Sequence, residues 1–226
     1  MRRTIFVNDE YYHIYNRGVD KRKVFLDDRD YIRFIINLRK FNTNLDYKKR
    51  DFLERKEREN KLAVKELSSR YRELSSNTDQ LIEIIAYCLN PNHYHFILRQ
   101  LVDNGISKFM HKVDLGYTNY FNPKHSRSGS LFQGTFKSIH IDSNEYLLWL
   151  SVYINLNPKL HKITNNLENY PWSSYLDYVG LRKGTLGNKD IILNQFSHRD
   201  YIYKNFIDNC LLEMKNRKDL KKYFIE

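Results

Sequence analysis

Four side chains in this sequence have the types and the spacing needed for metal-assisted chemistry. His93 and His95 lie two residues apart in an apolar segment typical of a β-strand, so both imidazoles leave the same face. Two rings on one face can reach a single cation, although two ligands are too few for a closed structural zinc site. Tyr153 and Asn157 are four residues apart in a segment with helical periodicity, which puts them on one helix face.

These residue types indicate a division of roles. The Asn157 amide oxygen is a candidate third metal ligand, and the Tyr153 hydroxyl is a candidate nucleophile beside the cation. A phenol has a pKa near 10 and attacks poorly at neutral pH unless a cation polarises the electrophile and stabilises the developing charge. A structural interpretation stays open, because the same helix also reads as an ordinary apolar stripe that ends before a proline.

The elements that must position these side chains are predicted by the pattern of the chain. We expect strands at 11–16, 81–89 and 93–98, and extended structure at 131–141 around Gly134. One helix is expected to have Asp28 or Asp30 as its N-cap, a second spans 105–121, and a basic loop follows at 122–129. A third helix is predicted from its N-cap Ser143 to residue 156, with Asn157-Pro158 ending it. This order is close to a ferredoxin-like α+β sandwich.

Composition and charge narrow the class of protein. The chain has 226 residues, of which 41% are hydrophobic and 29% charged, which excludes wholesale disorder. It has no apolar run of about 18 residues and no apolar segment near its N-terminus, so neither a membrane span nor a signal peptide is expected. Cys88 and Cys210 are too few for a disulfide framework and are expected to be buried thiols in a reducing cytosol.

The net charge of +11 indicates a polyanionic partner, and nucleic acid is the first candidate. Aromatic residues make up 15% of the chain, and rings interleaved with basic residues suit single strands, whose bases stack on them. For any single tyrosine, a place in the core remains the simpler interpretation. We expect DNA contacts from four basic residues, Arg17, Lys124, Arg127 and Lys137, and weaker ones from Lys21, Arg22 and Lys23.

Two segments fall outside the predicted sandwich. Residues 46–79 hold ten Lys or Arg and eight Asp or Glu, which predicts a solvated helical insertion spanning about 43–79. Residues 189–226 are expected to form a helical tail, either as an amphipathic surface or as a DNA clamp. The predicted organisation is one domain at 1–178 with a C-terminal appendage at 179–226.

Five ordered segments resemble a known family. The segment Asn90-Pro91-Asn92-His93-Tyr94-His95-Phe96 resembles the HUH motif (His, hydrophobic, His). The segment Tyr153-Ile154-Asn155-Leu156-Asn157-Pro158 resembles the catalytic-helix motif of the REP-associated branch of the single-tyrosine HUH transposases. Three further segments fit that branch: Tyr12 to Gly18, Ser128 to Lys137 and Tyr170 to Tyr175. The resemblance covers about residues 5–178.

The resemblance implies a ferredoxin-like HUH endonuclease fold and a transposase that nicks and rejoins single-stranded, hairpin-bearing DNA. It implies that His93, His95 and Asn157 bind Mg²⁺ or Mn²⁺, and that Tyr153 attacks a phosphate to leave a 5′-phosphotyrosine and a free 3′-OH. Manganese accepts imidazole more readily than magnesium does, so Mn²⁺ is expected to bind at least as well. A prokaryotic cytoplasm, at the nucleoid, is the expected compartment, and a homodimer is left open.

Departures from the family pattern and rival functions remain. The insertion is longer than the compact family core requires, Thr135 replaces a frequent basic residue, and Lys159-Leu160 replaces a basic-small pair. These departures bear on the DNA sequence that the protein would prefer.

One rival function is that of a domesticated, non-cutting binder of structured DNA or RNA on the same fold. A replication initiator or relaxase is disfavoured, because Trp149, one turn before Tyr153, cannot be a second nucleophile.

Overall fold

A four-stranded antiparallel sheet forms the centre of the molecule. The computed structural model describes residues 4–43, 80–197 and 200–216. The strands are β1 (Tyr11–Arg17), β2 (Ile82–Asn90), β3 (His93–Gln100) and β4 (Lys137–Ile141), in the spatial order β2-β3-β1-β4. All three pairings are antiparallel, and β3, which carries the histidine pair, lies in the interior of the sheet. The predicted insertion at 43–79 lies almost entirely outside the described residues.

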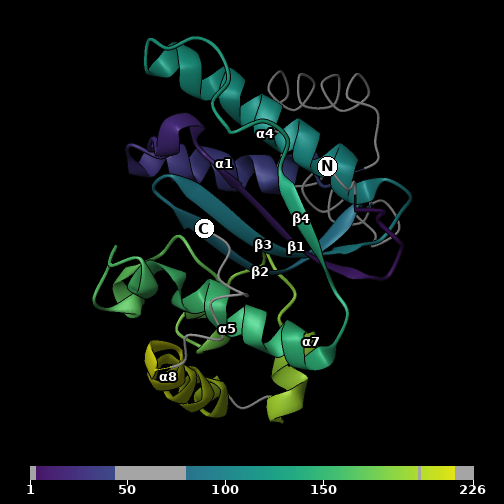
Figure 1. The fold of residues 1–226 in the computed structure, drawn as a ribbon, viewed down its shortest axis with the longest axis vertical. Coiled ribbons are helices and arrows are strands. Elements are labelled where there is room, and N and C mark those ends of the chain that lie inside the picture. Colours follow the sequence, from purple (N-terminus) through teal and green to yellow (C-terminus); the bar gives the residue numbers. More distant parts are fainter. Residues whose placement is uncertain (1–3, 44–79, 198–199, 217–226) are drawn as a thin grey trace, which may run out of the picture.

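Helices cover both faces of this sheet (Figure 1). The long helices α1 (Asp28–Phe41) and α4 (Gly105–Lys124) pack together on one face, and α5 (Asn144–Leu160) packs on the other. The chain continues through the short helices α6 (Tyr175–Tyr178) and α7 (Asp190–Leu193) to α8 (Asp200–Asn216). Three 3₁₀ turns, η1 (Val19–Lys21), η3 (Leu167–Asn169) and η4 (Asn194–Phe196), complete the described part of the chain. The expected α+β, ferredoxin-like class agrees with this arrangement.

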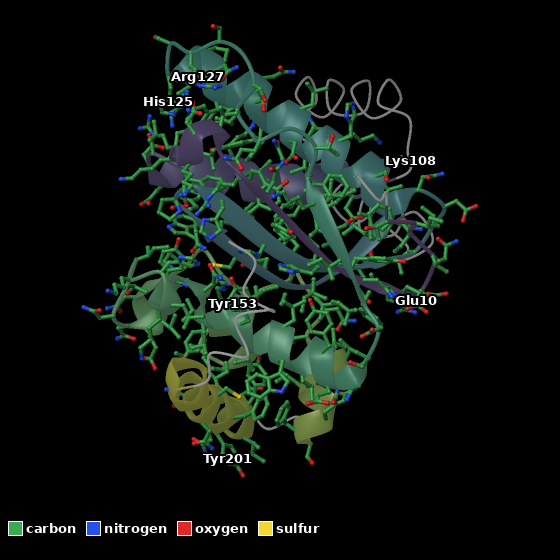
Figure 2. The ribbon with its side chains drawn as sticks, in the orientation of Figure 1. Glu10, Lys108, His125, Arg127, Tyr153 and Tyr201 are labelled. Atoms are coloured by element: carbon green, nitrogen blue, oxygen red, sulfur yellow. The ribbon has the colours of Figure 1, made fainter. Side chains whose placement is uncertain are left out.

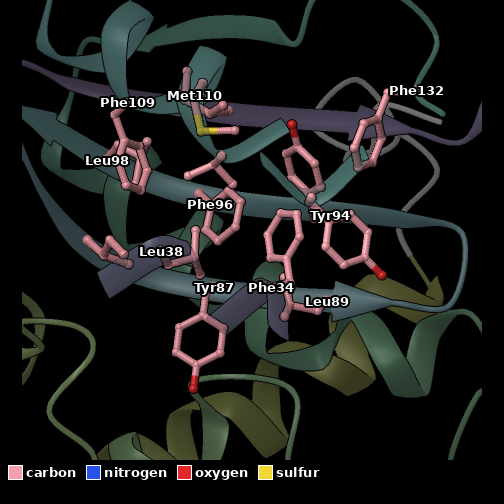
Figure 3. Close-up of a cluster of buried hydrophobic side chains, with 14 of the residues drawn as sticks. Phe34, Leu38, Tyr87, Leu89, Tyr94, Phe96, Leu98, Phe109, Met110 and Phe132 are labelled. Atoms are coloured by element: carbon pink, nitrogen blue, oxygen red, sulfur yellow. The ribbon is translucent and has the colours of Figure 1, made fainter. Parts of the chain in front are cut away.

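Side chains alternate along β3, so this strand borders two separate hydrophobic cores, one on each face of the sheet. Tyr94, Phe96 and Leu98 point to the α1 and α4 side, where they pack among buried aromatic residues (Figure 3). His95 and Ile97 point to the opposite side, and Ile97 joins the core formed with α5. Because successive side chains of a strand leave opposite faces, the sequence spacing that put Tyr94 in the core also put the two histidines together.

Helix α5 is buried on nearly all sides because a second helix covers it. Its residues from Leu150 to Pro158 are all buried, between the sheet and α8. On α8, Tyr203 is fully buried and its hydroxyl contacts Ser151 (3.1 Å) and accepts a hydrogen bond from the Asn155 amide (3.1 Å). This double packing explains why the segment is buried around its whole circumference instead of along one stripe.

Several predicted boundaries were wrong. Helix α5 starts at its predicted N-cap, Ser143, but continues through Pro158 to Leu160. Helix α4 likewise runs through Pro123 to Lys124, into the expected loop. Each proline lies in the last turn, where its missing N–H removes one hydrogen bond that packing outweighs. The N-cap of α1 is Asp27, whose carboxylate accepts from the Asp30 N–H (3.1 Å), and not Asp28 or Asp30.

The extended segment predicted at 131–141 is a strand only from Lys137 onward. Before that point the chain turns, with Gly134 at a φ of 73°, a conformation that favours glycine. A single bridge joins Phe132 to Gly18, and the Gln133 N–H donates to the Arg17 carbonyl (2.8 Å). The turn therefore brings this segment beside the end of β1.

No helix in the described part of the chain is long and apolar enough to cross a membrane.

Candidate active site

The histidine pair and the Tyr153–Asn157 pair meet where β3 faces α5. The ring centroids of His93 and His95 are 5.1 Å apart. The Tyr153 ring lies edge-on to the His95 ring, with centroids 5.7 Å apart. His95, Tyr153 and Asn157 are buried, with exposed fractions of 2%, 3% and 0%, and His93 keeps 8%. The structure thus brings together the four residues that the sequence singled out.

Asn90, at the end of β2, joins the two candidate ligands His93 and Asn157. It pairs with His93 across the hairpin, and its side-chain nitrogen lies 2.8 Å from His93 Nε2. The same Asn90 nitrogen donates to the Asn157 side-chain oxygen. On the other side of the ring, His93 Nδ1 lies 2.6 Å from the Asn92 oxygen, which can only accept. His93 therefore carries its proton on Nδ1 and directs the Nε2 lone pair at the Asn90 nitrogen.

His95 has a buried partner on the neighbouring strand. Its Nδ1 lies 2.9 Å from Nε2 of His13, a fully buried residue of β1. The rings of His13 and His95 are stacked, with centroids 5.1 Å apart. The Tyr15 ring also stacks on the His95 ring, with centroids 5.8 Å apart. Because His13 occupies Nδ1, the nitrogen of His95 left for a ligand is again Nε2.

Burial keeps these imidazoles neutral at physiological pH. It lowers the pKa of His93 to about 3, with further lowering by His161 and Arg17. Burial also lowers the pKa of His95 well below its ordinary value, with the neighbouring histidines adding to the effect. The pKa of His13 falls to about 3 for the same reason. A neutral imidazole is the form that binds a metal, so protons do not compete for these lone pairs near neutral pH.

The donor set fits a divalent cation that accepts both nitrogen and oxygen. His93 Nε2 and the Asn157 oxygen meet at the Asn90 nitrogen, the His95 ring lies 5.1 Å from the His93 ring, and the Asn157 nitrogen is buried with no hydrogen-bond partner among the described residues. Within the described ranges no three or more His, Cys, Asp or Glu side chains are grouped to hold a metal, so an amide must complete the set. Such a mixed neutral set suits Mn²⁺ better than Mg²⁺, which prefers oxygen shells.

A pocket of about 450 Å³ opens over the two histidines. It is bordered by three basic residues, Arg17, Lys21 and Lys137, and the Lys137 ammonium lies 5.9 Å from the centroid of the Tyr15 ring. The remaining lining residues are Tyr15, Asn16, His93, His95, Gln133 and His161. A basic rim with an aromatic face above two imidazoles suits a phosphodiester and its adjacent base.

Tyr153 lies behind His95 and does not line this pocket. It belongs to the core between the sheet and α5, and only 3% of it is exposed. The tyrosine that faces the pocket is Tyr15, on β1. A substrate phosphate can reach the Tyr153 hydroxyl only if this side chain or its helix moves.

Two of the basic residues expected to contact DNA lie elsewhere. Lys124, at the end of α4, pairs with Asp27 and with the fully buried Asp30, each at 2.7 Å. Arg127 donates to the Asn122 side chain (2.8 Å) and to backbone carbonyls of its own loop. Figure 2 shows Arg127 beyond α4, well separated from Tyr153. The structure therefore brings only Arg17 and Lys137 of the four to the histidines, and a DNA contact by the others stays a prediction.

Sequence reasoning missed three residues of the site, His13, Asn90 and His161. The His161 ring, just after α5, lies 5.0 Å from the His93 ring and lines the pocket. Its position four residues after Asn157, at the C-cap of the same helix, was a usable signal. Asn90 could have been found from the two-residue hairpin turn, which pairs it with His93. His13 had no local signal, because its partner lies 82 positions along the chain.

Comparison with known proteins agrees with the expected family and fold. A family model described as "Transposase IS200 like" matches residues 51–157. Among solved structures, the chain is similar to that of the REP-associated tyrosine transposase bound to a REP hairpin, with a TM-score of 0.54 and 16% sequence identity. That similarity covers 83% of this chain and 93% of the other. A search of curated proteins gave no match. The resemblance noted in the sequence and the fold class are confirmed.

Proposed function

We propose that this chain is an IS200-like transposase, which nicks and rejoins single-stranded, hairpin-bearing DNA through a covalent link to Tyr153. One observation carries the proposal: two neighbouring imidazoles, an amide oxygen close to one of them and a tyrosine ring lie together beneath a pocket with a basic rim. A hairpin is the proposed substrate feature because the structural relative is described as bound to a REP hairpin.

The proposed reaction is a transesterification. The Tyr153 hydroxyl oxygen forms a bond to phosphorus while the bond from phosphorus to the 3′ oxygen breaks. The phenol loses one proton and the departing 3′ oxygen gains one, so the step is balanced without water or a nucleotide. The phosphodiester is retained as a phosphotyrosine, and attack by a 3′-OH on that link reverses the step and joins the strands.

The residues of the pocket have distinct tasks in this proposal. His93, His95 and Asn157 would hold a divalent cation, which supplies polarisation of the phosphate and stabilisation of the charge that develops on its oxygens. Arg17 and Lys137 bind the backbone next to the cleaved phosphate, and Tyr15 offers a ring on which a base can stack. A single tyrosine attached to one strand at a time fits cut-and-rejoin chemistry.

The burial of Tyr153 favours a second candidate, a binder of structured DNA that does not cut. In that case the pocket holds a phosphate against Arg17 and Lys137 while the tyrosine remains a core residue. Both functions require the chain to bind DNA, and we propose that it does so in the prokaryotic cytoplasm. It could act there as a single chain or as a homodimer. The domain limits at 1–178 and 179–226 remain part of the proposal.

Covalent adduct formation separates the two functions. The full chain is incubated with Mn²⁺ and a hairpin-bearing single strand labelled at its 3′ end, and a labelled band that resists denaturation is expected. Tyr153→Phe is expected to bind the same DNA and form no adduct, whereas Tyr15→Phe, the matched pocket tyrosine, is expected to keep it. An adduct that persists in Tyr153→Phe and disappears in Tyr15→Phe would assign the nucleophile to β1, and none in the wild type would favour the non-cutting binder.

A further inference from the structure

The Asn90 side chain lies at the point where the candidate cation ligands converge. Its nitrogen lies 2.8 Å from His93 Nε2 and also donates to the Asn157 oxygen. These are the same two lone pairs that the proposed cation would use. Asn90 is fully buried, so no water competes for its amide. In the metal-free chain, its two N–H groups therefore satisfy two of the three candidate ligands.

A cation and the Asn90 N–H groups cannot share these lone pairs. His93 Nε2 has one lone pair in the plane of its ring, and a cation bound there displaces the N–H that points at it. Asn90 must then move away or present a different atom. Its place is held by the β2–β3 hairpin, where Asn90 pairs directly with His93, so its side chain stays beside the ring.

The distances suit a ligand oxygen close to the present position of the Asn90 nitrogen. Adjacent ligands of a cation bound at 2.0–2.2 Å lie about 3 Å apart in an octahedral shell. The Asn90 nitrogen is 2.8 Å from His93 Nε2 but lies on the lone pair that the cation would use, so an oxygen reaches a neighbouring coordination position only if the side chain also shifts off that axis. A half-turn of the amide about its last side-chain torsion exchanges the two atoms, and that torsion is broad and close to two-fold.

The other contact of the Asn90 amide tolerates this half-turn. Its oxygen accepts from the Cys88 thiol at 3.3 Å. After the exchange the amide nitrogen faces the same sulfur, and a thiol sulfur can accept as well as donate. Cys88 is a free, buried thiol with no disulfide partner. Without a cation the amide is hydrogen-bonded at both ends, and with one its nitrogen would face the Cys88 sulfur while its oxygen binds the cation.

We propose that Asn90 is a further protein ligand of the catalytic cation, binding through its side-chain oxygen after the amide turns over. This inference rests on the proposed function, since it concerns the cation assigned to His93, His95 and Asn157. In the metal-free chain the same side chain holds His93 and Asn157 together by donating to both. The ligand set then becomes two imidazoles and two amide oxygens.

Metal binding by the DNA-free chain tests the inference directly. Mn²⁺ is titrated into metal-free protein and the free ion is measured by electron paramagnetic resonance. Asn90→Leu is expected to weaken Mn²⁺ binding roughly tenfold or more, a loss typical even of partners outside the first shell. Asn90→Asp, which supplies a charged oxygen, is expected to bind more tightly. Asn37→Leu, an equally buried change in α1, is the matched control and should bind like the wild type.

Each outcome of the Mn²⁺ titration either supports or overturns the inference. If Asn90→Leu binds Mn²⁺ as tightly as the wild type or more tightly, Asn90 is only a placeholder that the cation displaces, and the inference fails while the proposed function stands. If the wild type binds no Mn²⁺, the cation itself is wrong and both fail. Should Asn90→Leu lose its circular dichroism signature of a folded chain, Asn90→Ala is titrated in its place and decides in the same way.

Discussion

At the residue scale, the hydrogen bond between His13 and His95 is expected to set which nitrogen of His95 is free. For Nε2 to bind a cation, the His95 proton must lie on Nδ1 and be donated to His13 Nε2, 2.9 Å away. His13→Leu leaves that buried N–H without a partner and should weaken Mn²⁺ binding about 10–100-fold. His13→Gln restores an acceptor and should recover most of the affinity.

Two measurements check the role of His13. Mn²⁺ titration gives the affinities, and ¹⁵N shifts of the His95 ring in metal-free protein report which nitrogen carries the proton. Equal affinities for the wild type and His13→Leu would show that the bond only packs the core. A tautomer change together with rescue by His13→Gln would not follow from a general loss of stability, which thermal unfolding of both variants measures separately.

The chemistry of single residues was partly predictable from the sequence. Residue type and spacing selected His93, His95, Tyr153 and Asn157, because alternation in a strand and the four-residue repeat of a helix are local properties. The half-buried setting of Tyr15 at the pocket and the deep burial of Tyr153 were not predictable. Both depend on which strand lies beside β3 and on how α5 packs, and these are long-range consequences of the fold.

At the element scale, the start of α5 depends on Ser143. The Ser143 hydroxyl oxygen accepts from the Tyr146 N–H at 3.2 Å, which satisfies one of the free N–H groups of the first turn. Ser143→Ala should lower the free energy of unfolding by about 1 kcal/mol, the usual cost of losing such a cap. Urea denaturation measures it, with the exposed loop substitution Ser128→Ala as control. No difference between the two variants would mean that packing alone fixes the helix start.

The contact between β3 and α4 is expected to depend on pH. The Tyr94 hydroxyl contacts both oxygens of Asp114 at 2.9 Å, and burial raises the pKa of this carboxyl to about 7. Between about pH 4, its value in an unfolded chain, and pH 7, the folded state binds more protons than the unfolded state. The contribution of Asp114 to stability is therefore full below pH 4 and is lost as the pH rises through 7.

Asp114→Asn removes this dependence while keeping an acceptor for Tyr94. Relative to the wild type, the variant should gain free energy of unfolding between pH 5 and pH 8, measured by urea denaturation at both values. Asp142→Asn, on the exposed turn after β4, is the matched control and should give the same difference from wild type at both pH values. A constant offset for Asp114→Asn would mean that its carboxyl titrates normally in the folded chain.

At the scale of the whole molecule, the C-terminal tail is part of the structure around the site. The sequence predicted a helical tail but not its contacts, because a tail helix has no local signal for its docking surface. In the structure α8 covers α5 through Tyr203, Ile207 and Cys210, which lie in the core beneath the helix that carries Tyr153. Any movement that exposes Tyr153 therefore has to be accommodated by α8 as well as by the sheet.

The net charge of +11 is distributed unevenly with respect to the pocket, and this determines how salt should act on DNA binding. Lys124 is held by Asp27 and Asp30, whereas Arg17 and Lys137 border the pocket. For single strands, log K falls with log salt by about 0.7 for each phosphate neutralised. Arg17→Ala and Lys137→Ala should therefore each make the slope shallower by about 0.7, as measured by fluorescence anisotropy with a hairpin-bearing single strand.

Lys124→Ala provides the contrast, because its loss leaves the buried Asp30 carboxylate without its closest cation. This variant should unfold at lower urea concentration, and since Lys124 lies away from the pocket its salt slope should change less than that of Arg17→Ala or Lys137→Ala. The hairpin-bearing strand should also compete better than a blunt duplex of equal charge, because only unpaired bases can stack on Tyr15. If all three variants shift the slope equally, and duplex and hairpin bind alike, the charge acts as a diffuse field over the surface and the pocket does not select its DNA.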